Sequence, residues 1–177
     1  MMRRKDREKS REFGLAVIDS TAYGVLTVVG TDQEPYAIPL SIVRDGDNLY
    51  FHSARAGQKV DLFAPEPLVC IAFVGRVEVP DRYNQAQLDD LSAGPLSGSM
   101  LSRIFTTEFE SAIVRGHVVR VVNVEEQIHA LRLICEKYTP TKMSLFDAAI
   151  QSGLPHTAIY RVPIETITAK QKLVHAD

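Results

Sequence analysis

The stretch "YFHSARAGQKVDLF", Tyr50 to Phe63, decides the fold. It begins with aromatics and a histidine at strand-like positions and becomes small, polar and basic between Ser53 and Lys59. Apolar residues resume at Val60, so a strand is predicted to turn into a short helix within this stretch. The start of such a helix presents backbone amides beside an ammonium group, which is the chemistry of an anion-binding site.

Apolar and β-branched runs on both sides of this stretch predict antiparallel strands. The runs are "YGVLTVVG" (23–30), "PYAIPLSIV" (35–43), "NLYFHS" (48–53), "LVCIAFVG" (68–75), "SAIVRGHVVRVVN" (111–123), "HTAIYRVP" (156–163) and "ETITAKQKL" (165–173). The Asp45-Gly46 pair predicts a tight hairpin turn. Pro39 lies inside one run, and because its nitrogen cannot donate to a strand ladder, it predicts an edge, a bulge or a barrel opening there.

Helical spacing of apolar residues predicts three helices between and around the strands. An N-terminal helix is expected within residues 1–20, from Asp6 to about Ser20, and a shorter one over "SLFDAAIQSG" (144–153). The clearest is "NVEEQIHALRLICEKY", which Asn123 would cap, with Glu126 completing a capping box. This order predicts a mainly β (α+β) fold, an antiparallel barrel with peripheral helices, in a single domain spanning residues 1–177.

The composition is that of a globular protein: of 177 residues, 45% are hydrophobic and 24% are charged. A net charge of −2 gives no general attraction to nucleic acid or an anionic membrane, so neither is expected as a partner. Cys70 and Cys135 lie among apolar residues without metal-ligand spacing, which favours buried thiols in a reducing compartment and no metal site. With no membrane-length apolar run, we expect a cytoplasmic protein.

Two charged or polar segments do not contribute to the barrel pattern. Residues 80–104, "PDRYNQAQLDDLSAGPLSGSMLSRI", form an insertion longer than a hairpin loop and are predicted to be a lid or an interface arm. A basic cluster at Arg3, Arg4, Lys5 and Arg7 is diluted by acidic neighbours, and we interpret it as a solvated first turn of the N-terminal helix.

The order of these motifs resembles a known family. "MRRKDRE", "PYAIPLSIV", "LYFHSARAGQKVDLF", "PLVCIAFV" and the segment from "FTTEFESAIVRG" to "EKYTP" are similar to the FMN-binding split-barrel proteins related to pyridoxamine 5'-phosphate oxidase. Within that superfamily, the chain is most similar to the branch named for 5-nitroimidazole resistance, the Nim-type proteins. The resemblance runs from about Arg3 to Pro140 and includes the opening stretch.

The resemblance implies a homodimer with two flavins at the subunit interface. The FMN phosphate would lie beside His52, Ser53, Gly57, Gln58, Lys59 and Val60. The isoalloxazine ring would lie along Ile38, Pro39, Leu40 and Ser41, and the partner subunit would contribute Phe109, Glu110 and Ser111. Phe109 could equally be a core aromatic. By resemblance His52 is a candidate catalytic residue, as a proton donor, and its alternative role is to hydrogen-bond the phosphate.

The implied activity is that of an FMN-dependent oxidoreductase. It would pass electrons from a reduced nicotinamide to a small acceptor such as a nitroaromatic. Two alternatives stay open: a flavin-binding protein without turnover, and a haem-binding or haem-degrading relative with a histidine as iron ligand. The tail "ETITAKQKLVHAD" lacks the basic motifs of true pyridoxamine phosphate oxidases, so that reaction is not expected.

Overall fold

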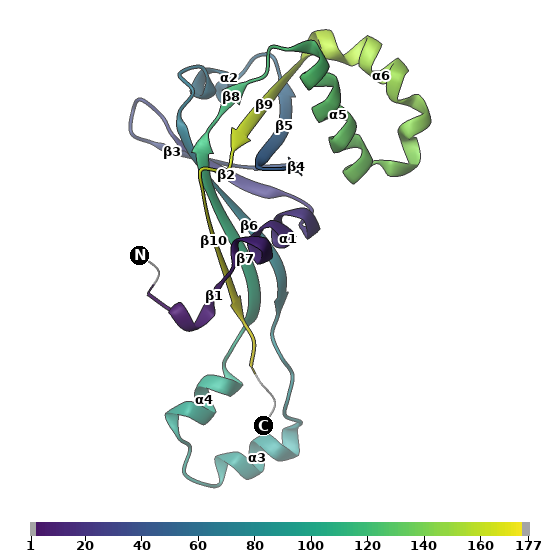
Figure 1. The fold of residues 1–177 in the computed structure, drawn as a ribbon. Helices are drawn as coiled ribbons and strands as arrows, with labels where there is room; N and C mark the ends of the chain where they lie inside the picture. Colours follow the sequence, from purple (N-terminus) through teal and green to yellow (C-terminus); the bar gives the residue numbers. More distant parts are fainter. Residues whose placement is uncertain (1–2, 175–177) are drawn as a thin grey trace.

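The computed structural model describes residues 3–174, so both ends of the range 1–177 expected for a single domain lie outside the described residues. Two antiparallel sheets face each other (Figure 1), with strand orders β1-β10-β7-β6-β2-β3 and β4-β5-β9-β8. The strands are β1 (Glu8–Lys9), β2 (Gly24–Val29), β3 (Pro35–Leu40), β4 (Val43–Asp45), β5 (Asn48–Ala54), β6 (Leu68–Glu78), β7 (Glu108–His117), β8 (Val119–Arg120), β9 (Thr157–Pro163) and β10 (Thr166–Lys172).

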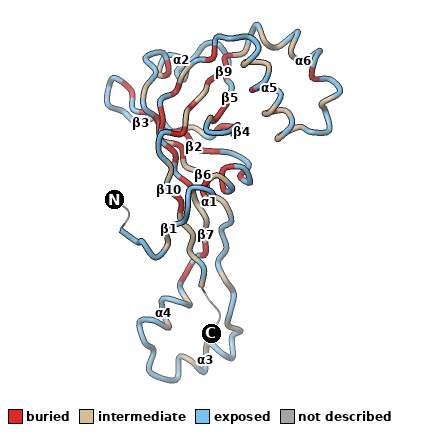
Figure 2. The backbone as a smooth tube through the Cα atoms, viewed as in Figure 1, coloured by how far each residue is buried: buried red, intermediate tan, exposed pale blue. Residues whose placement is uncertain are grey.

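The main core lies between the two sheets. Successive strand residues point to opposite faces, so one apolar face of each sheet turns inward. Leu26, Ile71 and Val114 come from the six-stranded sheet, and Phe51 and Tyr160 from the four-stranded one. Figure 2 shows the buried residues concentrated along these strands. The predicted mainly β, antiparallel fold with peripheral helices is confirmed, although the strands form two separate ladders rather than one closed barrel.

The N-terminal helix begins later than predicted. α1 spans Arg11–Ser20, and the Ser10 hydroxyl caps it by accepting a hydrogen bond from the Phe13 amide at 3.2 Å. The prediction that helix starts at Asp6 is therefore wrong, because residues 5–7 form a 3-10 turn (η1) and β1 pairs with β10 as the edge strand of the sheet. α1 contacts β6, β7 and β10 through an apolar face that includes Val17 and Ile18.

The predicted strand over residues 35–43 divides between the two sheets. β3 belongs to the six-stranded sheet and β4 to the other, so the chain crosses between sheets at Ser41 and Ile42. Pro39 lies on β3 opposite Val25, and β3 is an edge strand, as the proline predicted. The hairpin turn is confirmed as well, since Asp45 pairs with Asn48 and Gly46 has a φ of +55°.

The valine-rich run that was predicted as one strand is also divided. β7 ends at His117 in the six-stranded sheet, and β8 begins at Val119 in the four-stranded sheet. Between them the Val118 amide donates to the Pro67 carbonyl at 3.1 Å instead of to a ladder. Gly116 permits the crossing, because a β-carbon there would collide with the backbone carbonyl of Pro163.

Helices cover the outer face of the four-stranded sheet. α5 (Val124–Tyr138) is followed by η2 (Pro140–Leu145), α6 (Phe146–Gly153) and η3 (Leu154–His156). Ala130 and Ile134 of α5 pack with Tyr50 and Ile159 of the sheet in a second buried cluster.

The predicted N-cap of α5 is confirmed, because the Asn123 side chain accepts from the Glu126 amide at 2.8 Å. The other half of the predicted capping box is replaced by a contact with the sheet. The Glu126 carboxylate accepts instead from the Tyr50 hydroxyl at 3.0 Å and from Arg161 at 2.9 Å.

The 80–104 segment forms a projecting arm. It contains α3 (Gln85–Ser92) and α4 (Gly98–Ile104), which lie beyond the ends of β6 and β7, far from α2 (Gln58–Phe63) (Figure 1). No residue from 81 to 105 is buried. Cys70 and Cys135, elsewhere in the chain, are free but only half-buried, which corrects the expectation of fully buried thiols.

Candidate functional site

The turn between β5 and α2 has the predicted strand-to-helix form. Gly57 precedes the helix with φ +112° and ψ 169°, a conformation that strongly favours glycine. Phe63 anchors the helix, with its ring 5.8 Å from that of Phe51 and 5.2 Å from that of Tyr160. At the opposite end of α2 no side chain caps the first amides, and Gln58 is exposed while Lys59 and Val60 are half-buried. An external acceptor can therefore approach the helix start.

His52 and Lys59 lie close to each other at this turn. The His52 ring is exposed on the face of β5 that also carries Tyr50. Desolvation by the surrounding protein lowers the pKa of His52, and the positive charge of Lys59 lowers it further. A neutral imidazole beside an ammonium group gives this surface hydrogen-bonding capacity and a positive potential, both of which suit an anion.

Ser53 points to the other side of the strand. It is buried, and its hydroxyl donates to the carbonyl of Ala54 at 2.7 Å. Because consecutive residues of a strand face opposite sides, His52 and Ser53 cannot direct their side chains to the same point while β5 stays regular. The structure therefore groups His52 with Lys59 and places the Ser53 side chain on the core side.

Arg55 is a cation of this turn that the sequence analysis did not select. Its Nε donates to the carbonyl of Thr157 and its Nη2 to that of Leu154, both at 3.3 Å. These bonds hold the guanidinium against the start of β9. Both acceptors are backbone carbonyls, so these bonds do not neutralise its charge. The sequence "SARAGQK" already indicated this second cation, because Arg55 stands four positions before Lys59.

The residues expected along the flavin ring lie on and just after the edge strand β3. Pro39 and Ser41 are exposed, Leu40 is buried, and Ile38 packs partly buried against the main core. An edge strand leaves backbone N–H and C=O groups on one side without a strand partner. These groups can pair with the polar edge of a planar ring.

The residues expected from the partner subunit lie at the arm end of β7. Phe109 is half-buried and pairs with Val77 and Lys172 on the outer face of the six-stranded sheet, outside both buried clusters. Ser111 shares that face, whereas Glu110 faces the other way and accepts from Gln171 at 2.9 Å. Figure 1 shows α2 at the opposite end of the molecule from the arm, so one chain alone does not bring the two sets together.

Comparison with known proteins matches this architecture. The family described as pyridoxamine 5'-phosphate oxidase matches residues 10–87, which include β2 to β6 and the β5–α2 turn. A protein assigned to 5-nitroimidazole antibiotic resistance from Bacteroides thetaiotaomicron superposes with a TM-score of 0.68 at 22% identity, covering 92% of this chain and 84% of that chain. The chain has the split-barrel fold of the pyridoxamine 5'-phosphate oxidase-related superfamily.

Two other split-barrel structures are similar to the chain. The FAD and heme binding protein from Mycobacterium smegmatis has a TM-score of 0.73 at 16% identity, covering 97% of this chain and 76% of that one. The flavocytochrome Anf3 from Azotobacter vinelandii has a TM-score of 0.72 at 17% identity, covering 100% and 75%. No curated protein sequence matches the chain. At these identities the structures establish the split-barrel fold alone.

Between residues 3 and 174, no cluster of three or more histidine, cysteine or acidic side chains is arranged to hold a metal ion. Over the same residues, no helix combines the length and apolar character that crossing a membrane requires.

Proposed function

We propose that this split-barrel protein binds FMN and uses it to reduce a small acceptor. The observation that carries the proposal is the β5–α2 turn, where no side chain caps the helix start, the charge of Lys59 acts on His52, and Arg55 precedes Gly57 in the chain. Phosphate dianions are bound by such combinations of backbone amides and charge-assisted donors. The resemblance of the sequence to the superfamily assigns the cofactor phosphate to this same turn.

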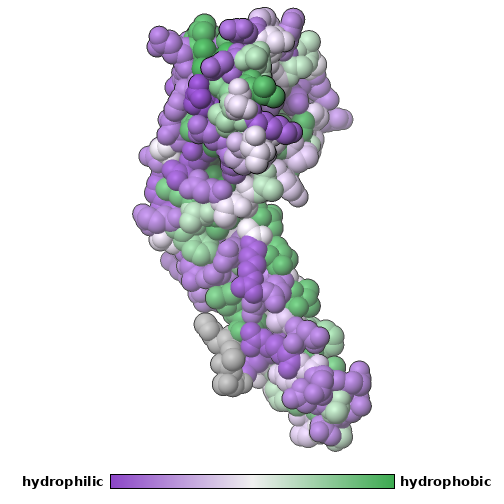
Figure 3. Space-filling view, turned by 90° about the vertical axis from the view of Figure 1, so that its right-hand side faces the viewer, coloured by the Kyte–Doolittle hydropathy of each residue, from purple (hydrophilic) through white to green (hydrophobic). Residues whose placement is uncertain are grey.

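A second copy of the chain would complete the flavin site. The outer face of the six-stranded sheet carries exposed apolar side chains, and Figure 3 shows hydrophobic residues along one edge of the middle of the molecule. Those on this face include Val29, Val74, Val77 and Ile113. Exposed apolar surface of this kind marks association sites. In a dimer through this face, the ring would lie against β3 of one subunit and near Phe109 and Ser111 of the other.

The arm would extend this dimer interface. It exposes Leu96, Leu101 and Phe105, with exposed fractions of 39%, 37% and 81%. Residues 81–105 contribute no buried side chain within one chain, so the arm has no core of its own. Packing against a partner would bury that apolar surface, which favours the role of an interface arm over that of a lid.

The protein's own groups would position the cofactor and supply protons, while bound FMN would supply the electron-transfer chemistry. Lys59 and Arg55 would hold the phosphate, and the backbone of β3 would orient the ring. His52 is neutral near pH 7 because its pKa is lowered, so it can donate one N–H to the phosphate. As a proton donor to a reduced acceptor it would first have to gain a proton, which the neighbouring Lys59 charge opposes.

Turnover tests this proposal. The FMN-loaded protein is mixed anaerobically with NADH or NADPH and then with nitroaromatic and quinone acceptors, and oxidation of the nicotinamide is followed at 340 nm. Acceptor-dependent oxidation supports the proposed reductase. Flavin binding without turnover would identify a non-catalytic flavin-binding protein, and a Soret band on addition of haem without flavin uptake would favour the haem-binding alternative.

A further inference from the structure

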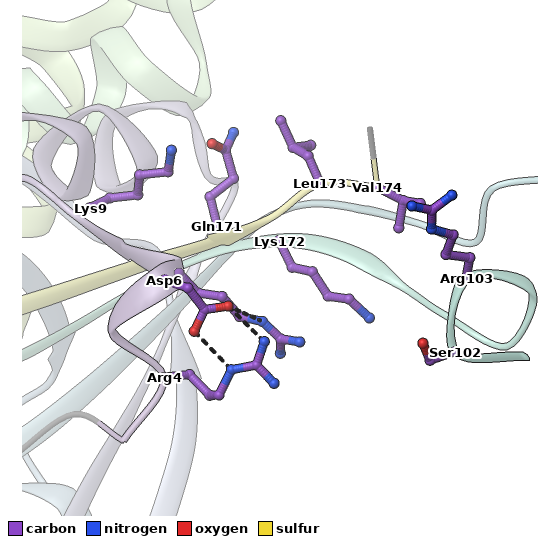
Figure 4. A pocket seen from close by; sticks show the side chains of 10 residues that line it. Arg4, Asp6, Lys9, Ser102, Arg103, Gln171, Lys172, Leu173 and Val174 are labelled. Atoms are coloured by element: carbon purple, nitrogen blue, oxygen red, sulfur yellow. Dashed lines mark hydrogen bonds and ion pairs between the residues drawn. The ribbon is translucent and has the colours of Figure 1, made fainter. Parts of the chain in front are cut away.

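Phe105 stands at the base of the arm with 81% of its surface exposed. Its backbone is nevertheless held in place, because its amide donates to the Leu101 carbonyl at 2.9 Å and the Thr106 amide donates to the Ile104 carbonyl at 3.2 Å. Thr106 itself is buried, and its hydroxyl accepts from the ammonium of Lys172, whose side chain reaches towards α4 (Figure 4). An exposed aromatic side chain on a held backbone is typical of interface anchors.

A small pocket lies at the other end of the chain, beside α2. It has a volume of about 300 Å³ and opens between the β2–β3 turn, α2 and the segment before β6. The residues that line it include Val29, Leu62, Pro65, Pro67, Asp32 and Asp61. The first four are apolar, and carboxylates suit the positive edge of an aromatic ring. Because a cavity of roughly 150 Å³ can hold a benzene molecule, one aromatic side chain fits this pocket.

We infer that Phe105 of one subunit inserts into this pocket of a second copy of the chain. Within one chain the arm and α2 lie at opposite ends (Figure 1), so the contact forms only between subunits. The inference rests on the proposed dimer, in which Phe109 and Ser111 of one subunit lie near the flavin ring on β3 of the other. It adds to that dimer a specific contact outside the flavin site.

The strand register brings Phe105 and the pocket to the same level. Pro39, beside the proposed ring, pairs with Val25, and Val29 lies four residues farther along β2, away from the arm. Phe105 lies four residues before Phe109, towards the arm. A twofold axis perpendicular to the sheet reverses the strand direction, so equal steps from two matched residues lead to two matched positions. Phe105 therefore lies opposite Val29, which lines the pocket.

The pocket is also continuous with the proposed dimer face. Val29 is 54% exposed on that face, whereas Leu62, on the pocket's other wall, packs against the main core. Aromatic side chains that fill a partner's pocket are frequent anchors of protein interfaces. Gln58 and Asp61 of α2 line this pocket as well, so the inserted ring packs against the helix whose start is proposed to hold the flavin phosphate.

Cross-linking tests this contact directly. Cys70 and Cys135 are replaced by alanine, Phe105→Cys is combined with Val29→Cys, and the purified protein is treated with a short bis-maleimide. The control combines Phe105→Cys with Leu145→Cys, an exposed position on η2 outside the dimer face, and each single-cysteine variant is treated in the same way. Light scattering over a dilution series then compares the dimers of Phe105→Ala and Leu145→Ala.

We expect a covalent dimer only when Phe105→Cys and Val29→Cys are both present, and a dimer at least tenfold weaker for Phe105→Ala but not for Leu145→Ala. A wild-type dimer without this cross-link, or equal dissociation of the two alanine variants, would overturn the contact and leave the flavin proposal standing. A monomeric wild type would overturn the contact together with the dimer, and FMN titration of that monomer tests the flavin site separately.

Discussion

His52 and Ser53 are adjacent in the chain, yet the strand that contains them directs them to different surroundings. His52 faces Lys59 at the exposed turn, and Ser53 donates to a backbone carbonyl on the core side. The alternation follows from the strand period alone, so the sequence was sufficient to predict it. The proximity of His52 to Lys59 depends on how the chain turns at Gly57, which no periodicity specifies.

At the His52–Lys59 pair, replacing Lys59 by methionine should raise the pKa of His52 towards its ordinary value of 6.5. Desolvation would still lower it, since that is the larger cause. NMR titration of the histidine ring protons measures the change, with Lys142→Met as a charge-matched control. An unchanged His52 pKa in the Lys59 variant would show that the two side chains do not interact.

The same lowered pKa gives stability a definite pH dependence. The folded protein disfavours protonated His52, so this residue's contribution is complete above pH 6.5 and is lost as the pH falls from there through the lower folded pKa. Urea unfolding at several pH values should show a smaller acid-side loss in Lys59→Met than in the wild type. An equal or larger loss would contradict the assigned cause.

Gly57 should be intolerant of a side chain for conformational reasons alone. A β-carbon would meet no atom within 4 Å, but φ is +112°, so Gly57→Ala should destabilise the fold by roughly 1–3 kcal/mol. The control is Gly153→Ala, at the end of α6, which also has open space but a φ of −92°. Urea unfolding compares the stabilities of the two variants. Equal stabilities would mean that the turn relaxes without strain.

At the scale of elements, the two asparagine caps should have different effects. Asn123→Ala removes the cap of α5, which packs on the four-stranded sheet, and should lower the free energy of unfolding by about 1 kcal/mol. Asn84→Ala removes the capping box of α3, in the arm, where no residue is buried. Global unfolding in urea should change little for Asn84→Ala, and an equal loss would show that the arm unfolds together with the sheets.

Most elements could be predicted from the sequence because each has a clear apolar period. The two strand breaks could not, since Leu40 and Val43 are apolar and buried on both sides of the first crossing, and the β-branched run continues through Val118 and Val119 at the second. The start of α1 was placed too early, because charged residues at 6–9 suit an exposed edge strand as well as a helix. A sequence pattern indicates that a residue is buried, but it does not indicate which sheet the residue belongs to.

For the whole molecule, the account predicts a dimer through the outer face of the six-stranded sheet. Ile113→Lys places a charge on that face and should weaken the dimer, whereas Val122→Lys, at an exposed position outside the sheets, should not. Size-exclusion chromatography with light scattering should give twice the 19.7 kDa chain mass for the wild type and the control. A monomeric wild type, or a dimer unaffected by Ile113→Lys, would contradict the proposed interface.

The cofactor assignment also depends on the whole molecule, because the two halves of the predicted site lie at opposite ends of one chain. The sequence resemblance groups His52 to Val60 of one subunit with Phe109 to Ser111 of its partner, so the proposed site would be complete only in a dimer.

The measurement that tests the central claim most directly is FMN titration of the protein, followed by flavin absorption and fluorescence quenching, beside the Lys59→Ala variant. We expect the wild type to take up FMN and the variant to lose roughly 1.5–3 kcal/mol of binding free energy, the contribution of a charge-assisted hydrogen bond. A wild type that binds no FMN, or a variant that binds it equally well, would contradict the assignment of the flavin phosphate to the β5–α2 turn.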